Sequence, residues 1–308
     1  MISIFPEFKN LDIDDKTEVD RFLNLFLPYS DFNFASIFSY DVNEKSMICW
    51  LNDNLVLKFY DYITQKPFIT FLGKTKVGET VDELFKYLEL HDLPPELKLI
   101  PEDVINNLPK EYFTRYDIRE DFDNNDYVVS VNELTQMEEG KNHTKKRYMH
   151  KFVEFCPDHV VRDLDLKDEL VKFEINSLLK KWRIQREKSE EDVKVEFTAI
   201  KRLLDHAKFF KLHTYGVYCK GILVGFTINE VVHGGYYMGH FGKADLRYKG
   251  LTSYLEFITA QEMKKLGAKY MNFEQDMGIE GLKHSKESWH PDHLLKKFTI
   301  KTKDLEFD

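Results

Sequence analysis

The sequence predicts an α+β protein of two domains, each a mixed, mostly antiparallel sheet flanked by helices. At 308 residues the chain exceeds the usual size of one small domain. Both halves combine stretches of helical period with strand-like runs separated by turn residues. Apolar residues make up 43% and charged residues 31%, which supplies a core and gives no indication of disorder. We expect domains at residues 1–130 and 131–308.

The first half opens with an amphipathic helix. Asp14 and Asp15 precede apolar side chains at helical spacing from Val19 to Phe26. Asp-Asn type turns separate the runs that follow. The pattern predicts strands at 34–40, 46–51, 55–60 and 67–72, a helix at 81–90 and a short helix at 101–108.

The second half starts with helices and then changes to the strand period. A short strand at 127–131 precedes this half, which then holds a helix at 141–155, a strand at 159–162, and helices at 167–182 and around 197–207. Three strands at 214–219, 222–232 and 236–243 are joined by glycine turns at 220–221 and 233–235. A helix carrying Leu251 and Leu255, and a strand at 269–274, complete the pattern.

Charge is divided unevenly along the chain. Residues 1–140 hold 13 Lys and Arg against 28 Asp and Glu, a net charge of −15, whereas residues 141–308 hold 31 against 25, a net charge of +6. The front half therefore disfavours nucleic acid and phosphate, and the back half can attract them.

Neither a secretion signal nor a membrane span is indicated. The N-terminus lacks a basic flank and an apolar run, and no apolar stretch approaches the length of a spanning helix. Three cysteines without a CxxC pair fit unpaired, buried thiols in a reducing compartment. We therefore expect a soluble, cytoplasmic protein with no transmembrane segment.

The order of elements in the second half resembles the GNAT acyltransferase fold. In that fold a glycine turn at a helix N-terminus binds the pyrophosphate of the acyl carrier, and the matching stretch runs from Arg247 through Gly250 to Thr252. Free amides and the helix dipole favour an anion there. Thr252 departs from the small residue usual at its position, and a plain strand-to-helix turn is the alternative interpretation.

A second motif is more specific. The stretch Asn272 to Pro291, with Lys243-Ala-Asp245 before it and Leu294 to Phe298 after it, resembles the phosphatidylglycerol lysyltransferase C-terminal-domain family. The basic stretch Lys145 to Phe152 also resembles that family. Its members are two GNAT-like units in tandem, as are the Fem-type aminoacyltransferases. The resemblance implies two tandem GNAT-like domains and transfer of an aminoacyl group from aminoacyl-tRNA to an amine or hydroxyl.

Two carboxylates are the candidate catalytic groups. Glu274 and Asp276 flank Gln275 at a predicted strand end, so in extended geometry they share one face. Repulsion between two close carboxylates suits one of them to proton abstraction. The alternative is that one pairs with Lys283 or Lys286 and braces the loop.

Candidate acyl-donor and phosphate-binding residues lie on three segments. Lys283 and Lys286 project from one side of a predicted helix start, and the stretch 141–151 holds five Lys or Arg. Solvated helix faces are the alternative interpretation for both. The full set of candidates is Lys146, Arg147, Lys243, Arg247, Gly250, Thr252, Lys283 and Lys286. His233, His240, His290 and His293 lack the companions of a standard metal site, so we expect no metal.

The leading hypothesis is a tandem GNAT-like aminoacyltransferase without a tightly bound cofactor. Its co-substrate is aminoacyl-tRNA, Glu274 or Asp276 is the base, and amides of the strand 236–243 stabilise the oxyanion. The acceptor is a small molecule or a lipid headgroup. The alternatives are an acyl-CoA dependent N-acyltransferase acting on a small amine, and a non-catalytic protein that binds RNA or a partner.

Overall fold

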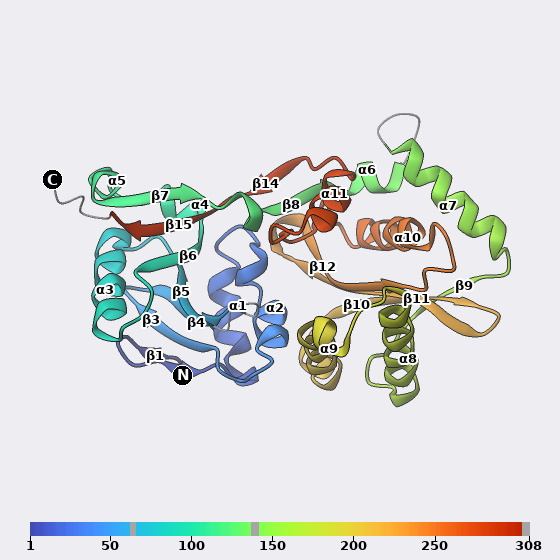
Figure 1. The fold of residues 1–308 in the computed structure, drawn as a ribbon, viewed down its shortest axis with the longest axis horizontal. Helices are drawn as coiled ribbons and strands as arrows, with labels where there is room; N and C mark the ends of the chain where they lie inside the picture. The colour runs from blue at the N-terminus through green and yellow to red at the C-terminus, as the bar shows by residue number, and fades with distance from the viewer. Residues whose placement is uncertain (62–65, 137–141, 304–308) are drawn as a thin grey trace. The chain divides into compact units, whose positions relative to one another are not determined.

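The computed structural model describes residues 1–61, 66–136 and 142–303, which form two compact units (Figure 1). The first unit contains residues 1–126, 275–278 and 295–308, and the second contains 127–274 and 279–294. The predicted division near residue 130 differs from this at the C-terminal end, because the last strand belongs to the first unit. Each unit holds one sheet with helices against it.

The first unit has a sheet ordered β1-β3-β4-β5-β6-β15-β7, with β2 paired to β3. Its strands are β1 (Ser3–Ile4), β2 (Lys9–Asn10), β3 (Met47–Leu51), β4 (Asn54–Tyr60), β5 (Pro67–Leu72), β6 (Glu96–Pro101), β7 (Tyr116–Glu120) and β15 (Lys297–Thr302). Its helices are α1 (Lys16–Leu23), α2 (Phe34–Tyr40), α3 (Val77–Leu90), α4 (Glu102–Ile105) and α5 (Tyr112–Arg115).

The second unit has a sheet ordered β14-β8-β13-β12-β11-β10-β9. Its strands are β8 (Asp126–Ser130), β9 (Val160–Asp163), β10 (Leu212–Cys219), β11 (Ile222–Val232), β12 (Tyr236–Ala244), β13 (Tyr270–Asn272) and β14 (His293–Leu295). Its helices are α6 (Val131–Gln136), α7 (His143–Phe155), α8 (Glu169–Gln185), α9 (Glu190–Asp205), α10 (Leu251–Lys265) and α11 (Glu280–Glu287).

Both units contain the same local motif. Three antiparallel strands are followed by a helix and then by a strand parallel to the third: β3-β4-β5-α3-β6 in the first unit and β10-β11-β12-α10-β13 in the second. A parallel pair needs a crossover connection, and the helix supplies it. The repeated motif agrees with the prediction of two similar units in tandem.

Helices cover both faces of the second sheet (Figure 1). Helix α10 packs with α6 and α7 over one face, where Tyr237, Met271 and Trp289 are buried in a common core. Helix α8 packs on β11 and β12 and against α9. A capping box at Ser189 starts α9.

The prediction of a strand at 34–40 was wrong, because these residues form α2. The side chain of Asn33 accepts a hydrogen bond from the Ser36 amide and so caps the helix. Phe34, Ile37 and Phe38 are buried at helical spacing. Burial of one helical face thus outweighs the strand propensity of the aromatic residues.

The prediction of three unpaired thiols was also wrong. The structure links Cys156, which follows α7, to Cys219 at the end of β10, with Cα atoms 6.4 Å apart. Cys49 is a free, buried thiol. The pair is 63 residues apart in sequence, so spacing gave no signal for it.

A buried ammonium group joins four segments of the first unit. Lys297 is fully buried and its Nζ lies 2.7 Å from Asp126 Oδ1, 2.9 Å from Gln275 Oε1 and 3.1 Å from Ser30 Oγ. It also donates to Asp31. This cluster holds residues 30–31, 126, 275 and 297 together within the unit.

Candidate functional site

The pairing of β12 with β13 ends partway along β12. The last paired residues are Met238 and Asn272, whereas β12 continues to Ala244. On the other side, the register of β12 with β11 shifts at Gly239 and Phe241, so His240 is the extra residue of a bulge. In the described part of the chain, β12 and β13 form no pair beyond Met238, so residues 239–244 of β12 run past the end of β13. Backbone amides at such a strand end are donors of the kind that stabilise a developing oxyanion.

Glu274 lies directly beyond the end of β13. Its amide donates to the Asn272 side chain at 2.7 Å, and its carbonyl accepts from the Tyr127 amide at 3.2 Å. Its φ is 60°, so the extended geometry that the sequence predicted for Glu274 and Asp276 was wrong. A positive φ in a non-glycine residue is costly and is often found at functional sites. The Glu274 side chain is 21% exposed.

His240 faces Glu274 and a second carboxylate. Its Nδ1 lies 3.8 Å from Glu274 Oε1, and its Nε2 lies 3.4 Å from Glu230 Oε2. Burial opposes the charged imidazolium, but the two carboxylates outweigh burial and raise the pKa of His240 to about 9. From the sequence pattern, His240 was a candidate only as a metal ligand, and nothing indicated Glu230. The described residues contain no group of three or more His, Cys, Asp and Glu suited to a metal.

Asp276 has a different environment. It is buried in the first unit, and its Oδ1 accepts the Gly278 amide at 2.8 Å. Gly278 has a φ of 70° and takes the left-handed conformation that the loop requires. This contact braces the loop through a main-chain amide, whereas the alternative stated from the sequence was a pair with Lys283 or Lys286.

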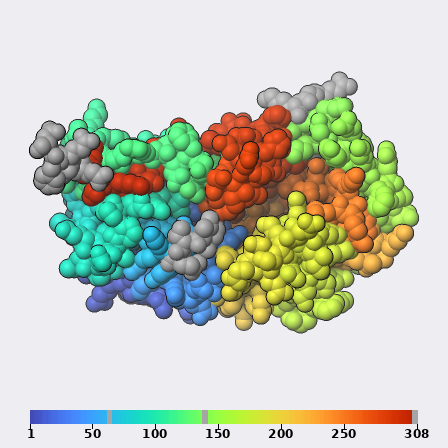
Figure 2. Space-filling model, viewed as in Figure 1, coloured from blue at the N-terminus to red at the C-terminus, as the bar shows by residue number. Residues whose placement is uncertain are grey.

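The two lysines of α11 have different contacts. Lys286 Nζ donates to the carbonyl of Phe273, the residue before Glu274, and so fixes the end of β13. Lys283 is exposed on α11. The orange-red end of the chain, to which α11 belongs, lies at the surface in Figure 2. Lys283 therefore has the exposure that phosphate binding needs, and Lys286 braces the site from within.

The turn at Arg247 is already engaged by protein groups. Buried Asp245 pairs with the Arg247 guanidinium at 2.8 Å and accepts from the Arg247 amide at 3.1 Å, while the Leu246 amide donates to Gln185 at 2.9 Å. Burial opposes the charge of Asp245, but Arg247, Lys181 and Gln185 hold its pKa well below the usual range. Part of the donor set expected for pyrophosphate is thus used inside the unit.

Gly250 is required by a close approach of α7 to the start of α10. Its φ is 91°, and a Cβ there would lie 1.7 Å from the Tyr148 carbonyl oxygen. The glycine therefore permits packing of the basic helix against the turn. Thr252 is exposed in the first turn of α10.

The other cationic candidates lie on α7 and β12. Lys146 is half-buried and Arg147 is exposed on α7. Lys243 pairs with Glu196 at 2.6 Å and lies over the Trp182 ring at 4.6 Å. The structure therefore leaves Arg147 more accessible to a large anion than Lys243.

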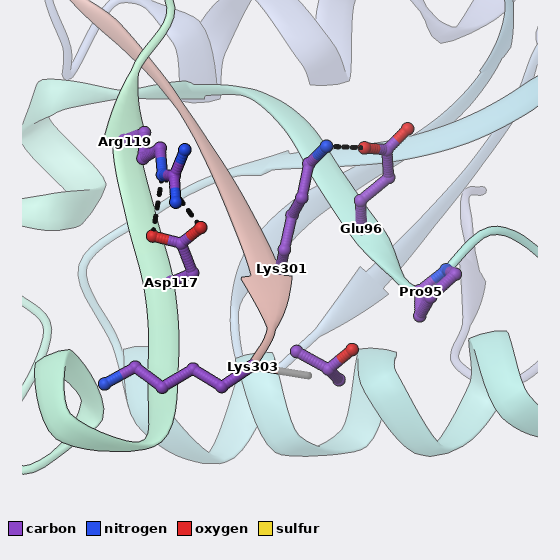
Figure 3. A pocket seen from close by; sticks show the side chains of 7 residues that line it. Pro95, Glu96, Asp117, Arg119, Lys301 and Lys303 are labelled. Atoms are coloured by element: carbon purple, nitrogen blue, oxygen red, sulfur yellow. Dashed lines mark hydrogen bonds and ion pairs between the residues drawn. The ribbon is translucent and has the colours of Figure 1, made fainter. Parts of the chain in front are cut away.

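A pocket of about 570 Å³ in the first unit lies away from these residues in sequence (Figure 3). Among the residues that line it, Arg119 points to Asp117 on the same strand at 2.8 Å, and Lys301 points to Glu96 on the neighbouring strand at 3.0 Å. Because these charges pair with one another, the pocket offers little unbalanced charge to a ligand.

Comparison with known proteins agrees with this fold. The family model described as phosphatidylglycerol lysyltransferase, C-terminal, matches residues 68–301. A conserved protein of unknown function from Bacteroides thetaiotaomicron VPI-5482 is 20% identical with a TM-score of 0.83, and the match covers 98% of this chain and 100% of that one. No curated protein matches the sequence significantly.

Two further solved structures have the same fold. L-PGS from Bacillus licheniformis is 12% identical, with a TM-score of 0.65 and coverage of 100% of this chain and 95% of that one. FemX is 10% identical, with a TM-score of 0.57 and coverage of 96% and 97%. The predicted fold class, two tandem GNAT-like units, is confirmed. No helix in the described part of the chain is long and apolar enough to cross a membrane.

Proposed function

Because the chain belongs to the phosphatidylglycerol lysyltransferase C-terminal family, an acyltransferase family of the GNAT type, we propose that it transfers an aminoacyl group from aminoacyl-tRNA. The acceptor is an amine or hydroxyl of a small molecule or a lipid headgroup. The observation that carries the proposal is the position of Glu274, which lies beyond the last β12–β13 pair and beside the part of β12 that continues past it, with Oε1 3.8 Å from His240 Nδ1.

Glu274 is the base in this proposal. It takes a proton from the attacking amine or hydroxyl as the new bond to the acyl carbonyl carbon forms. It returns the proton to the ribose oxygen of the donor as the ester bond breaks. The amides of β12 stabilise the oxyanion between these steps. Asp276 is the weaker candidate, because its buried carboxylate accepts the Gly278 amide.

The basic helix α7 supplies the contact with the donor. Exposed Arg147, with Lys146 beside it, can bind tRNA phosphates, as can Lys283 on α11. An acyl-CoA donor is less well supported, because Asp245 and Gln185 already engage amides of the turn and the Tyr148 carbonyl faces Gly250. An aminoacyl-tRNA donor also fits the predicted cytoplasmic location.

The test is a transfer assay with purified protein. Transfer RNA charged with a mixture of radiolabelled amino acids is offered with amines, polyols and phosphatidylglycerol vesicles as acceptors. We expect label to move from tRNA to one acceptor, and Glu274→Gln to lower the rate about 10²–10⁴-fold. Absence of transfer to every acceptor would contradict the proposal.

Calorimetry separates the two donors. Binding of coenzyme A at micromolar concentration would favour the acyl-CoA alternative. No binding of coenzyme A, together with salt-sensitive binding of tRNA that weakens in Arg147→Ala, would favour the aminoacyl-tRNA donor. Gly281→Ala on α11 serves as the neutral control, since a Cβ there meets nothing within 4 Å.

A further inference from the structure

Three side chains from neighbouring strands meet in the second unit: Glu230 on β11, His240 on β12 and Glu274 just after β13. We infer that His240 is a positioning residue, held by Glu230 on one side so that its imidazolium orients the Glu274 carboxylate for proton transfer. This inference rests on the acyl transfer proposed above.

The geometry separates the residue that meets substrate from the residues that support it. The two imidazole nitrogens face different carboxylates, with Nε2 3.4 Å from Glu230 and Nδ1 3.8 Å from Glu274. The side chain of His240 is 2% exposed, that of Glu230 13% and that of Glu274 21%. A substrate can therefore reach Glu274 more readily than the other two, and His240 acts through Glu274.

The backbone fixes both ends of this contact. Glu274 is held in its left-handed conformation by the Asn272 side chain and the Tyr127 amide. The Lys286 ammonium binds the preceding carbonyl. His240 is the extra residue of a bulge, a feature that redirects a side chain out of the regular strand alternation. The direction of the His240 side chain thus follows from the bulge in β12.

The charges around the imidazole favour its protonated form. Burial opposes that form, yet Glu230 and Glu274 raise the pKa of His240 to about 9, so His240 is an imidazolium at neutral pH. Helix α8 packs on β11 and β12 and against α9, and Glu196 of α9 pairs with Lys243 of β12, so these two charges offset each other. Both nitrogens of an imidazolium carry N–H groups, and in His240 each nitrogen lies within ion-pair distance of one carboxylate, at 3.4 Å from Glu230 and 3.8 Å from Glu274.

The proton balance of the reaction leaves His240 unchanged. Glu274 receives one proton from the acceptor and gives one to the leaving ribose oxygen, while the imidazolium keeps both of its N–H protons. One Glu274 oxygen, Oε1, faces His240. In this inference the other oxygen, Oε2, accepts the substrate proton, so the imidazolium sets which oxygen reacts.

The first test reads His240 directly by ¹H–¹⁵N NMR titration of the histidine side chains, with the His240 signal assigned by its loss in His240→Gln. We expect a pKa near 9 in the wild type and a decrease of roughly one to three units in both Glu230→Gln and Glu274→Gln. Glu196→Gln, which removes a carboxylate that pairs with Lys243, should leave the His240 titration unchanged.

A second measurement links the titration to transfer. Since the inference requires imidazolium, kcat/KM should fall as pH rises through about 9, and in Glu230→Gln this fall should move to lower pH together with the NMR titration. A purely structural role of Glu230 would not move the pH profile. If His240→Gln fails to fold, the pH profiles of kcat/KM for wild type and Glu230→Gln still carry the test, because they need no assigned histidine signal.

The outcomes separate the inference from the proposed function. Wild-type transfer with a His240 pKa near 6.5, or with a titration that Glu274→Gln leaves unchanged, overturns the inference alone. The expected titration without transfer to any acceptor overturns the proposed function, and with it the catalytic purpose given to His240. The expected titration together with a shifted pH profile supports both.

Discussion

Replacing Lys297 by Met should destabilise the first unit strongly. Methionine keeps the length of the buried side chain but removes the ammonium group that lies between Asp31 and Asp126. The two carboxylates then remain buried without their cation. Removal of one partner from a buried ion pair costs about 3–5 kcal/mol. Native proteins have a total stability of about 5–15 kcal/mol, so this loss is a large share of it.

The assay is urea denaturation of wild type and Lys297→Met at pH 7, followed by far-UV circular dichroism. Lys301→Met is the matched control, because Lys301 lies on the same strand but pairs with Glu96 at 3.0 Å with 54% of its side chain exposed. An exposed pair contributes about 0–1 kcal/mol. Equal losses in the two variants, or a loss below about 1 kcal/mol in Lys297→Met, would refute the reasoning.

Acidification provides a further check on Lys297→Met. Burial raises the pKa of Asp31, and Lys297 opposes that rise in the wild type. Without the lysine, a proton can neutralise the carboxylate. The penalty of the variant should therefore be full near pH 7 and should shrink as pH falls. A penalty independent of pH between 7 and 5 would contradict this explanation.

Three other predictions concern the second unit. Gly250→Ala should cost about 1–3 kcal/mol in thermal unfolding, because a Cβ there meets a main-chain carbonyl of α7, whereas Gly281→Ala should be close to neutral. The pKa of His240 is raised to about 9 in the folded protein, above the value near 6.5 of an unfolded histidine. The stabilisation from its charged form is therefore complete below about pH 6.5 and is lost as pH rises through 9. His240→Gln should flatten this decline in the free energy of unfolding. Burial raises the pKa of Glu256 to about 7, although Lys145 opposes the rise. Above that pH the carboxylate is charged, which disfavours the folded state. The stability of Glu256→Gln relative to wild type should therefore be higher at pH 8 than at pH 4. Urea unfolding midpoints measured across pH check the His240 and Glu256 predictions. A Glu256→Gln variant that is less stable than wild type at pH 8 would contradict the Glu256 prediction.

The order of elements in the second unit was predictable because local chemistry specifies it. Lys220 and Gly221 both have positive φ in the turn between β10 and β11, and the glycines at 234 and 235 do the same before β12. Such turns, together with a change from helical to strand period, fix where strands start and end. The motif from Asn272 to Pro291 then indicated the family that the comparisons show.

The charged cluster of the candidate site was not predictable in this way. Glu230 and His240 meet because of strand register and a bulge, and neither is encoded by spacing in one segment. The misassigned α2 has the same origin, since burial of its apolar face depends on the rest of the unit. Glu274 itself was identified from its motif, but its left-handed backbone depends on the contact with the Tyr127 amide, far away in the sequence.

Strand β15 has a consequence for how the protein is made. It lies between β6 and β7, so in the first sheet these two strands are bridged by residues 297–302, which come well over 100 residues later in the sequence. During synthesis the ribosome releases residues 1–126 long before this strand, and until then β6 and β7 expose unpaired edges. The amino-terminal unit therefore reaches its native hydrogen bonding only after residue 302 has been translated, which makes the nascent chain dependent on protection against aggregation.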